Sequence, residues 1–373
     1  MKIPTYLAWQ LKKTDSLFKK QKLGSFDIPV YNPQNHYIDL TKSDYYWALL
    51  NLRHFIKASS DCYFGNIIGA TNIDLFMMTP SVSSPMGPGS DSEAISIKFG
   101  DLETFLTDSS QFGFEPLLLN KFKKVYCYLP SLRGENPNKR HLNQFYHCEA
   151  EILGELDDIM PIVEGYVKFL IETSYKLTSL IKKISDDYPA TLMAIRSIKN
   201  SKSFPKITFD EAVKLLSENG YDSLINKTEY GRDIVSEGEI ILSRILGYKI
   251  PFWICNYDRD RVAFYQKPDP ENPNKVINAD LIFPPLTESS FGGEIAGAGQ
   301  RQNNPDEILE SLNRQNINAK TYEWYLNLRK LPGYKTTSGF GLGIERFMTW
   351  ILCLNDIKKS IPYPRLKNTK TCP

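Results

Sequence analysis

The sequence lacks the features of a membrane protein, a disulfide-stabilised protein or a zinc protein. Only 6 of its 373 residues are cysteine, and none belongs to a CxxC pair or to a Cys/His cluster with zinc-ligand spacing. No apolar run approaches the roughly 20 residues of a membrane span. The opening residues, MKIPTYLAWQLKK, contain no signal-peptide core. We therefore expect reduced thiols in a cytoplasmic protein with no membrane partner.

The sequence also lacks a strong charge of either sign. The formal net charge is +2, so overall charge does not indicate a polyanion as partner, although tRNA stays possible. Hydrophobic residues make up 42% of the chain, which is enough for a sizeable core. Disorder throughout the chain is excluded.

Helices and strands are mixed along the chain without regular βαβ alternation. Apolar residues at helical spacing predict helices from Ser43, over 158–184 and 209–220, and after Gly343. Residues 61–80 are predicted to be extended, and 81–96 to form a loop. A hairpin is predicted over 125–152, with strands at 251–257, 261–266 and 276–283. This pattern predicts an α+β fold with a central antiparallel sheet flanked by helices.

The hairpin carries the first candidate site. Strand alternation places Arg133 and Glu135 on one face of the outgoing strand. The return strand presents four residues on one face: Phe145, His147, Glu149 and Glu151. An arginine fork suits phosphate, a phenylalanine can stack on a base, and carboxylates can hold an ammonium group or a metal. A solvated sheet face with surface ion pairs is an equally good interpretation of this hairpin alone.

Two further segments carry weaker signals. The run GFGLGIERF has three glycines where a strand leads into a helix, with Arg346 near the helix start, but on its own a structural turn explains it better than a binding site does. Asp280 and Glu294 lie near predicted strand ends, with Arg301 after a run of small residues. Two carboxylates can bind Mg²⁺ with nucleotide phosphates, although two unrelated surface acids are the simpler alternative.

Together these segments resemble a known family. LRGENPNKRHLNQFYHCEAEI resembles motif 2 of the class II aminoacyl-tRNA synthetases, and SGFGLGIERF resembles motif 3. The helix from Ser43 and the run ending at Pro80 resemble motif 1, the dimer-interface motif. FLTDSSQFGFE, GGEIAGAGQR and YEWYLNLR are similar to segments of the asparaginyl enzymes. The resemblance covers about residues 43 to 366, and it implies the class II catalytic fold and a homodimer formed through motif 1.

The resemblance implies an ATP site with Mg²⁺. Arg133 matches the arginine that contacts the α-phosphate, and Arg346 matches the motif 3 arginine over the adenine; both are implied to be catalytic. The other matching positions are the adenine-reading Glu135, His141 in the loop that approaches ATP, the stacking residue Phe145, and the Mg²⁺ carboxylates Asp280 and Glu294. Such a site can drive adenylate formation by positioning and charge neutralisation.

The resemblance also implies an amino-acid pocket. Gln111 matches a residue near the substrate α-amino group, where Glu149 and Glu151 add negative charge, and Arg301 matches the arginine that meets the substrate side chain. Phe114 stands where aspartyl enzymes have lysine, and Glu115 follows it. Because Glu115 would accept from an amide nitrogen but repel a carboxylate, we expect asparagine rather than aspartate.

The front of the chain departs from the family pattern. Residues 1–40 look like an N-terminal arm with little core, too short for the anticodon-reading barrel, and 41–373 is expected to be the catalytic domain. Within it, 186–232 is a possible insertion. We therefore expect an adenylate-forming ligase that passes asparagine to a non-tRNA amine acceptor. Three alternatives stay open: an asparagine synthetase using aspartate and ammonia, a truncated asparagine–tRNA ligase, and a non-catalytic relative.

Overall fold

A single large sheet organises the molecule. The computed structural model describes residues 2–22, 24–83 and 92–372. Eight strands follow the order β1-β5-β6-β13-β12-β11-β10-β7, antiparallel except at the two edges, where β1 pairs with β5 and β7 with β10 in parallel. These strands are β1 Thr71–Asn72, β5 Lys124–Leu132, β6 Gln144–Leu153, β7 Lys206–Thr208, β10 Phe252–Cys255, β11 Asn278–Phe283, β12 Gly293–Gln300 and β13 Thr337–Gly343. The predicted α+β fold with a central antiparallel sheet is confirmed.

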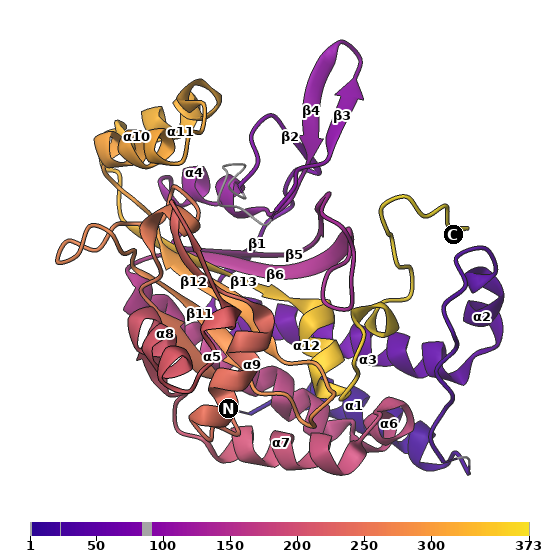
Figure 1. Ribbon diagram of the computed structural model, residues 1–373. Helices are drawn as coiled ribbons and strands as arrows, with labels where there is room; N and C mark the ends of the chain where they lie inside the picture. Colours follow the sequence, from indigo (N-terminus) through magenta and orange to yellow (C-terminus); the bar gives the residue numbers. More distant parts are fainter. Residues whose placement is uncertain (1, 23, 84–91, 373) are drawn as a thin grey trace.

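Helices cover one face of this sheet. Figure 1 shows the long helices below it and the smaller elements above it. The helices are α1 Thr5–Lys19, α2 His36–Lys42, α3 Asp44–Asp61, α4 Glu115–Leu118, α5 Leu156–Lys176, α6 Thr178–Ile184, α7 Tyr188–Asn200, α8 Phe209–Glu218, α9 Ser236–Ile245, α10 Pro305–Arg314, α11 Glu323–Arg329 and α12 Ile344–Ile351. Above the sheet, β2 Met78–Thr79, β3 Ser96–Phe99 and β4 Leu102–Leu106 form a separate small sheet.

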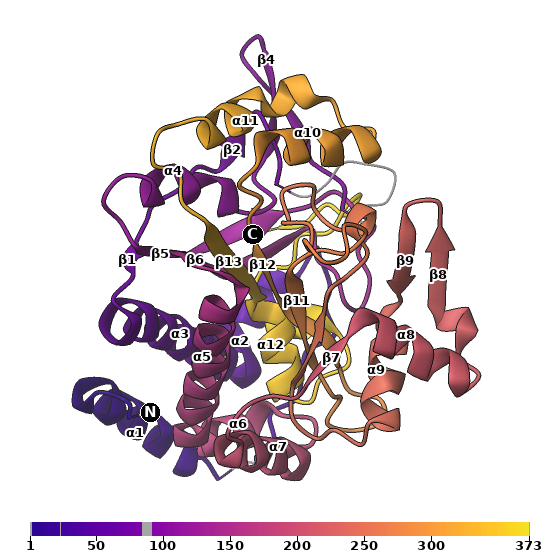
Figure 2. The same ribbon diagram turned by 90° about the vertical axis from the view of Figure 1, so that its left-hand side faces the viewer.

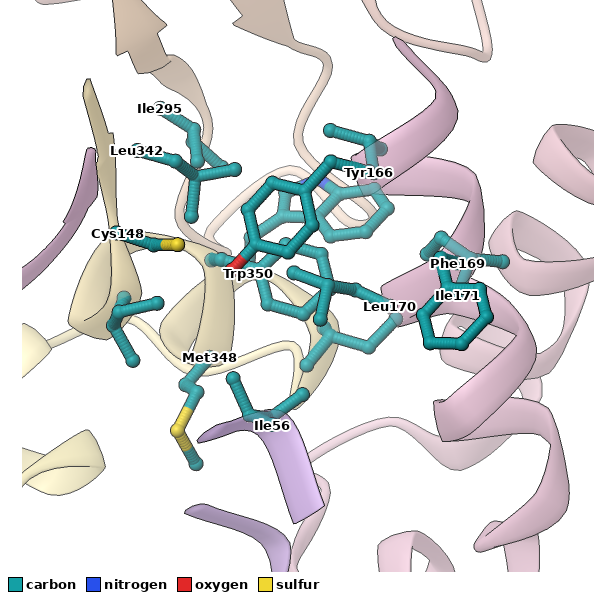
Figure 3. Close-up of a cluster of buried hydrophobic side chains, with 14 of the residues drawn as sticks. Ile56, Cys148, Tyr166, Phe169, Leu170, Ile171, Ile295, Leu342, Met348 and Trp350 are labelled. Carbon is teal, nitrogen blue, oxygen red and sulfur yellow. The ribbon is translucent and has the colours of Figure 1, made fainter. Parts of the chain in front are cut away.

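The main core lies between the sheet and the helices below it. In β6, Cys148, Ala150 and Ile152 are buried in the same cluster as side chains of α3, α5 and α12. Figure 3 shows Cys148 and Leu342 of the sheet facing Tyr166 of α5 and Met348 of α12. Successive side chains of a strand point to opposite faces, so the neighbouring residues of β6 point away from this core. The predicted common face of Phe145, His147, Glu149 and Glu151 is therefore confirmed, because all four line or adjoin the opposite face.

The N-terminal segment differs from its prediction. It was expected to have little core, yet α1 buries Leu7, Leu11 and Phe18 in the main core cluster. The helix packs against α5 and α6. Leu7 and Leu11 are one helical turn apart, which is the spacing of a helix with one buried face, but the prolines of this segment favoured an irregular chain. The division between an arm and a catalytic domain stays a prediction.

Three local predictions were wrong. Residues 62–68, expected to be extended, form a π-helix (Cys62–Ile68) that continues α3. The helix expected over 158–184 breaks at Leu177 into α5 and α6. The expected strand at 261–266 is absent from the described chain: a 3-10 turn at Arg259–Arg261 precedes coil there, with only an isolated bridge at Gln266. Of the loop expected at 81–96, residues 84–91 lie outside the described residues.

Residues 186–232 contribute to the sheet and also to a second cluster. Strand β7 extends the sheet beyond β10, while α8, α9 and the hairpin β8 (Ile225–Thr228) and β9 (Gly231–Ile234) surround their own apolar core. Figure 2 shows this group at one side of the molecule. Its origin as an insertion stays a prediction.

The cysteines and the helices bear on two properties expected from the composition, reduced thiols and the lack of a membrane span. All six cysteines are free thiols. No helix in the described part of the chain is long and apolar enough to cross a membrane. The cytoplasmic location itself stays a prediction.

If α1 is an integral part of the core, a cavity in it must destabilise the whole protein. We expect Leu11→Ala to lower the free energy of unfolding by about 2–5 kcal/mol, because Leu11 is fully buried. Leu17 of the same helix is 47% exposed, and Leu17→Ala should change stability by less than about 0.5 kcal/mol. Urea denaturation measures both, and equal midpoints would show that α1 is a loosely attached arm.

Candidate active site

An open cleft lies on the sheet face opposite the core. It consists of two cavities with empty volumes of about 590 and 620 Å³. The two share four lining residues, Arg133, His147, Glu294 and Gly341, so they are halves of one cleft. Of the twelve residues named from the sequence, five lie on strands β6, β11 and β12, Glu115 begins the short helix α4, and five more lie in segments that adjoin the sheet here. Only Arg346 lies on a helix of the core side, at the start of α12.

The first half of the cleft brings six predicted residues together. They are Arg133, Glu135, His141, Phe145, Glu294 and Arg346. Strand β5 ends at Leu132, so Arg133 and Glu135 lie in the loop after it and not, as expected, on the strand itself. The guanidinium of Arg133 lies 5.4 Å from the ring centroid of Phe145, and its Nε is buried without a hydrogen-bond partner among the described residues. A buried donor without an acceptor is costly, and an acceptor oxygen of a ligand in this half of the cleft would satisfy it.

Cations dominate this half of the cleft. Arg346 donates from Nη1 to Glu294 Oε2 at 2.9 Å, and its Nη2 lies 3.2 Å from His141 Nε2. Burial, together with Arg346 and Arg140, lowers the pKa of His141 to about 4. Burial of Arg140 and the positive charge of Arg346 lower the pKa of Arg140 to about 10. The mutual repulsion of these groups favours an anionic ligand, which would relieve it.

The second half of the cleft is polar and centred on Arg301. Gln111, Glu149, Asp280 and Arg301 line it. Arg301 Nη2 donates to Gln111 Oε1 at 2.5 Å and to Glu151 Oε2 at 3.1 Å. Arg301 and Glu151 are both almost fully buried. A Cβ at Gly339 would lie only 2.5 Å from Arg301 Nη2, so a glycine is required there for the arginine to cross the strand.

Glu149 is a buried carboxylate that lines this half of the cleft. Its Oε1 accepts from the Ser109 hydroxyl, and its Oε2 accepts from the Ser110 N–H at 2.7 Å. Burial outweighs these hydrogen bonds and raises the pKa of Glu149 to about 7. A cationic group in the cavity would favour the ionised form, so the site suits an ammonium group.

Asp280 and Glu294 meet where the two halves of the cleft join. A Cβ at Gly297 would lie 3.0 Å from Asp280 Oδ1 and 3.7 Å from Glu294 Oε1, so both carboxylates flank this glycine. Burial and then Glu294 raise the pKa of Asp280 well above its usual range. Burial also works against ionised Glu294, but Arg346 outweighs it and the pKa of Glu294 is lowered. In the described residues no group of three or more His, Cys, Asp or Glu side chains could hold a metal ion on its own.

Two predicted residues do not line the cleft. Glu151 lies beneath it and acts on the cavity through Arg301, with Thr337 donating to its Oε1 at 2.7 Å. Glu115 is 1% exposed and pairs with Arg329 at 2.6 Å. Its two oxygens accept from the Tyr325 hydroxyl at 2.5 Å and the Tyr334 hydroxyl at 2.9 Å. The expected direct contact of Glu115 with a substrate amide is therefore not present in this structure.

Two residues that the sequence did not indicate, Arg140 and Glu239, also shape the cleft. Arg140 lines it and stacks over Phe291 at 4.5 Å, and His147, expected only as part of the β6 face, lines it too. Glu239 of α9 accepts from the Glu294 N–H at 2.9 Å. Burial raises the pKa of Glu239 to about 7. Arg140 is next to His141 in the quoted motif and could have been named, whereas nothing in the sequence connects Glu239 with Glu294.

The raised pKa of Glu149 predicts a pH dependence of stability. The folded state binds this proton more tightly than the unfolded state, so its contribution is full below the ordinary pKa of 4.5 and is lost as the pH rises through about 7. When the pH is raised from about 5 to about 8, the unfolding free energy of the wild type should therefore fall by about 2 kcal/mol relative to that of Glu149→Gln, which has no carboxyl to titrate. Urea denaturation at both pH values tests this, with the exposed Glu271→Gln as control; parallel pH profiles of all three proteins would contradict it.

Comparisons with known proteins agree with this geometry. The family model described as tRNA synthetases class II (D, K and N) matches residues 31–367. Over 273 residues the chain is 33% identical to an asparagine–tRNA ligase of Pyrococcus abyssi, covering 72% of this chain and 58% of that protein. An asparagine–tRNA ligase of Mycoplasma genitalium is 31% identical over 339 residues, covering 87% and 70%. The chain thus spans just under three fifths of the length of the Pyrococcus relative.

A solved structure gives the same result. The asparaginyl-tRNA synthetase of Pyrococcus horikoshii, complexed with asparaginyl-adenylate, aligns with a TM-score of 0.79 and 26% identity. The alignment covers 94% of this chain and 77% of that one. Because the family model matches far more than half of the residues and the fold agrees, the chain belongs to the class II tRNA synthetases of the D, K and N group.

Proposed function

We propose that this chain activates asparagine with ATP, forming asparaginyl-adenylate and pyrophosphate. The observation that carries the proposal is the divided cleft. A cationic half with an unpaired buried arginine nitrogen adjoins a half with a buried carboxylate and a neutralised arginine. Triphosphate and adenine suit the first half, and an amino acid suits the second. The relatives with matching sequence are asparagine–tRNA ligases.

The residues of the cationic half would hold ATP. Phe145 offers a ring face for adenine, with Arg346 positioned for the nucleotide beside it. Arg133 lines both halves, so its guanidinium is placed to meet the α-phosphate where the two substrates join. When the asparagine carboxylate attacks the α-phosphorus, the bond to the bridging oxygen breaks and pyrophosphate leaves. Arg133 and Arg346 would stabilise the charge that develops.

Mg²⁺ fits beside the phosphates. Asp280 and Glu294 are neighbouring, half-buried carboxylates, and Glu294 opposes the ionisation of Asp280, which a divalent cation would relieve. Since two carboxylates alone make an incomplete site, phosphate oxygens would supply the remaining ligands. The ion would neutralise phosphate charge during adenylate formation.

The pairing of Arg301 favours asparagine over aspartate. Glu151 already neutralises Arg301 at 3.1 Å, and both side chains are desolvated. A substrate carboxylate here would add an uncompensated negative charge, whereas an amide oxygen needs only a hydrogen-bond donor. Discrimination against aspartate would therefore come from the paired Arg301 and not, as the sequence suggested, from direct repulsion by Glu115. Glu115 would contribute by holding Arg329, Tyr325 and Tyr334 in place.

Transfer of the activated asparagine to a non-tRNA amine stays our prediction for the second step. The matching relatives are tRNA ligases, so tRNA is the second candidate acceptor. A homodimer formed through α3 also stays a prediction. Trp47 and Leu50 of that helix are large apolar side chains that are 39% and 45% exposed, which is consistent with a covered face.

Amino-acid-dependent ATP–pyrophosphate exchange tests the first step without any acceptor. We expect exchange with asparagine and at least tenfold less with aspartate, because Arg301, the cation placed to meet the substrate side chain, is already paired with Glu151. Exchange with aspartate alone, followed by ammonia-dependent AMP release, would establish an asparagine synthetase. Absence of exchange with both amino acids, despite a folded protein, would overturn the proposal.

Arg346→Ala tests the assignment of the ATP half. The variant should lose at least about a hundredfold in exchange rate, because the cation that meets the nucleotide and orders Glu294 is removed. Arg314→Ala is the matched control, since Arg314 makes surface ion pairs with Asp260 and Glu310 away from the cleft. Normal exchange by folded Arg346→Ala would show that ATP does not bind where we place it.

A further inference from the structure

The loop between β5 and β6 carries Arg133, Glu135 and His141 but has no helix or strand of its own. Residues 133–143 are coil and bends, so the backbone positions of these three residues need support from elsewhere. Hydrogen bonds at the loop tip centre on Asn138: the Asn138 N–H donates to His141 O at 3.1 Å, and Asn138 Oδ1 accepts from the Arg140 and His141 N–H groups. These contacts order the tip of the loop, whereas the base of the loop is held by Asn143 and the C-terminal segment.

Asn143 joins the two sides of the loop at its base. Its side-chain Nδ2 donates to Arg133 O at 2.8 Å and to Glu135 O at 2.7 Å. Its backbone carbonyl accepts from the Arg133 N–H at 3.0 Å. Asn143 is only 7% exposed. One buried amide therefore fixes the backbone on either side of Gly134, where both proposed ATP ligands begin.

The C-terminal segment, residues 357–367, holds Asn143 from the other side. The Lys367 N–H donates to Asn143 Oδ1 at 2.5 Å, and the Asn143 N–H donates to Arg365 O at 3.2 Å. Leu366 packs on the cluster that contains Leu142 and includes Phe145 at its edge. Figure 1 shows the C-terminal chain, in yellow, leaving α12 and running up the side of the molecule. All polar groups of the Asn143 side chain are thus occupied.

Lys367 reaches the same loop by a second route. Its Nζ pairs with Glu93 at 2.9 Å. The backbone of Glu93 accepts from the Gly134 N–H at 2.6 Å and donates to Glu135 Oε2 at 3.3 Å. The ion pair is exposed and contributes little by itself. It nevertheless places the end of the chain against the side chain proposed to read adenine.

We propose that Asn143 is a positioning residue for nucleotide binding and that the C-terminal segment acts through it. Asn143 lines neither half of the cleft. It sets the backbone from which Arg133 and Glu135 reach the cleft, and the Lys367 N–H orients its amide so that Nδ2 faces the two carbonyls. The inference rests on the proposed ATP site and adds a residue and a segment that determine its affinity.

Direct binding of ATP, measured by calorimetry beside asparagine-dependent exchange, tests the proposal on the full chain. Asn143→Ala should weaken ATP binding about tenfold, because two donated hydrogen bonds are lost and two carbonyls are left unpaired. The KM for ATP should rise similarly, while the KM for asparagine stays within about twofold. A merely structural role would lower the melting temperature without separating the two KM values.

Two further variants make the result decisive. Asn219→Ala is the matched control, since the exposed Asn219 amide donates to a single carbonyl, Leu215 O, at the end of α8. Lys367→Pro removes the N–H that orients Asn143, together with the exposed ion pair to Glu93 that contributes little by itself, and leaves Asn143 intact. It should weaken ATP binding several-fold, and the double variant with Asn143→Ala should be no weaker than Asn143→Ala alone. If Asn143→Ala does not fold, the ATP affinity of Lys367→Pro tests the positioning role instead.

The outcomes separate this inference from the proposed function. Folded Asn143→Ala or Lys367→Pro with wild-type affinity for ATP would overturn the positioning role. Additive effects in the double variant would overturn the route through Asn143. If the wild type binds ATP but shows no exchange, the proposed function falls while the ATP affinities still test Asn143. If the wild type does not bind ATP, both proposals are overturned.

Discussion

The alternation of side chains along β6 is the constraint on which the rest of the structure depends. Cys148, Ala150 and Ile152 face the helices, while the residues between them face the cleft. The apolar face anchors the strand in the largest core of the molecule. Because a shift of one residue would exchange the two faces, burial of the first set holds Glu149 and Glu151 in their positions without any contribution from a ligand.

The buried charges of the cleft follow from this anchoring. Burying a carboxylate is costly unless it is paired or hydrogen-bonded, and the chain provides partners from several distant segments. Arg301 of the segment after β12 and Thr337 of β13 satisfy Glu151. Ser109 and Ser110 partly satisfy Glu149. Glu149, which is only partly satisfied, and the Nε of Arg133, which has no partner among the described residues, mark the places where a ligand would complete the network.

The fold also explains why elements remote in sequence matter for one site. Helix α9 places Glu239 against the backbone of Glu294, although α9 belongs largely to the smaller apolar cluster. The C-terminal segment packs on the loop that follows β5. The cleft is therefore assembled on rigid strands, and its less regular loop is supported from outside. An arrangement of this kind suits a reaction that depends on positioning two substrates and neutralising phosphate charge.

The sequence by itself determined the fold class, the family and the common face of β6, because strand period and motif spacing are local properties. It also named most of the cleft, from Arg133 to Arg346. Only the tertiary structure decided that Glu115 is enclosed by Tyr325, Arg329 and Tyr334, that α1 belongs to the core, and that Glu239 and Asn143 adjoin the site. These facts depend on which distant segments pack together, and long-range packing leaves no periodic signal in one sequence.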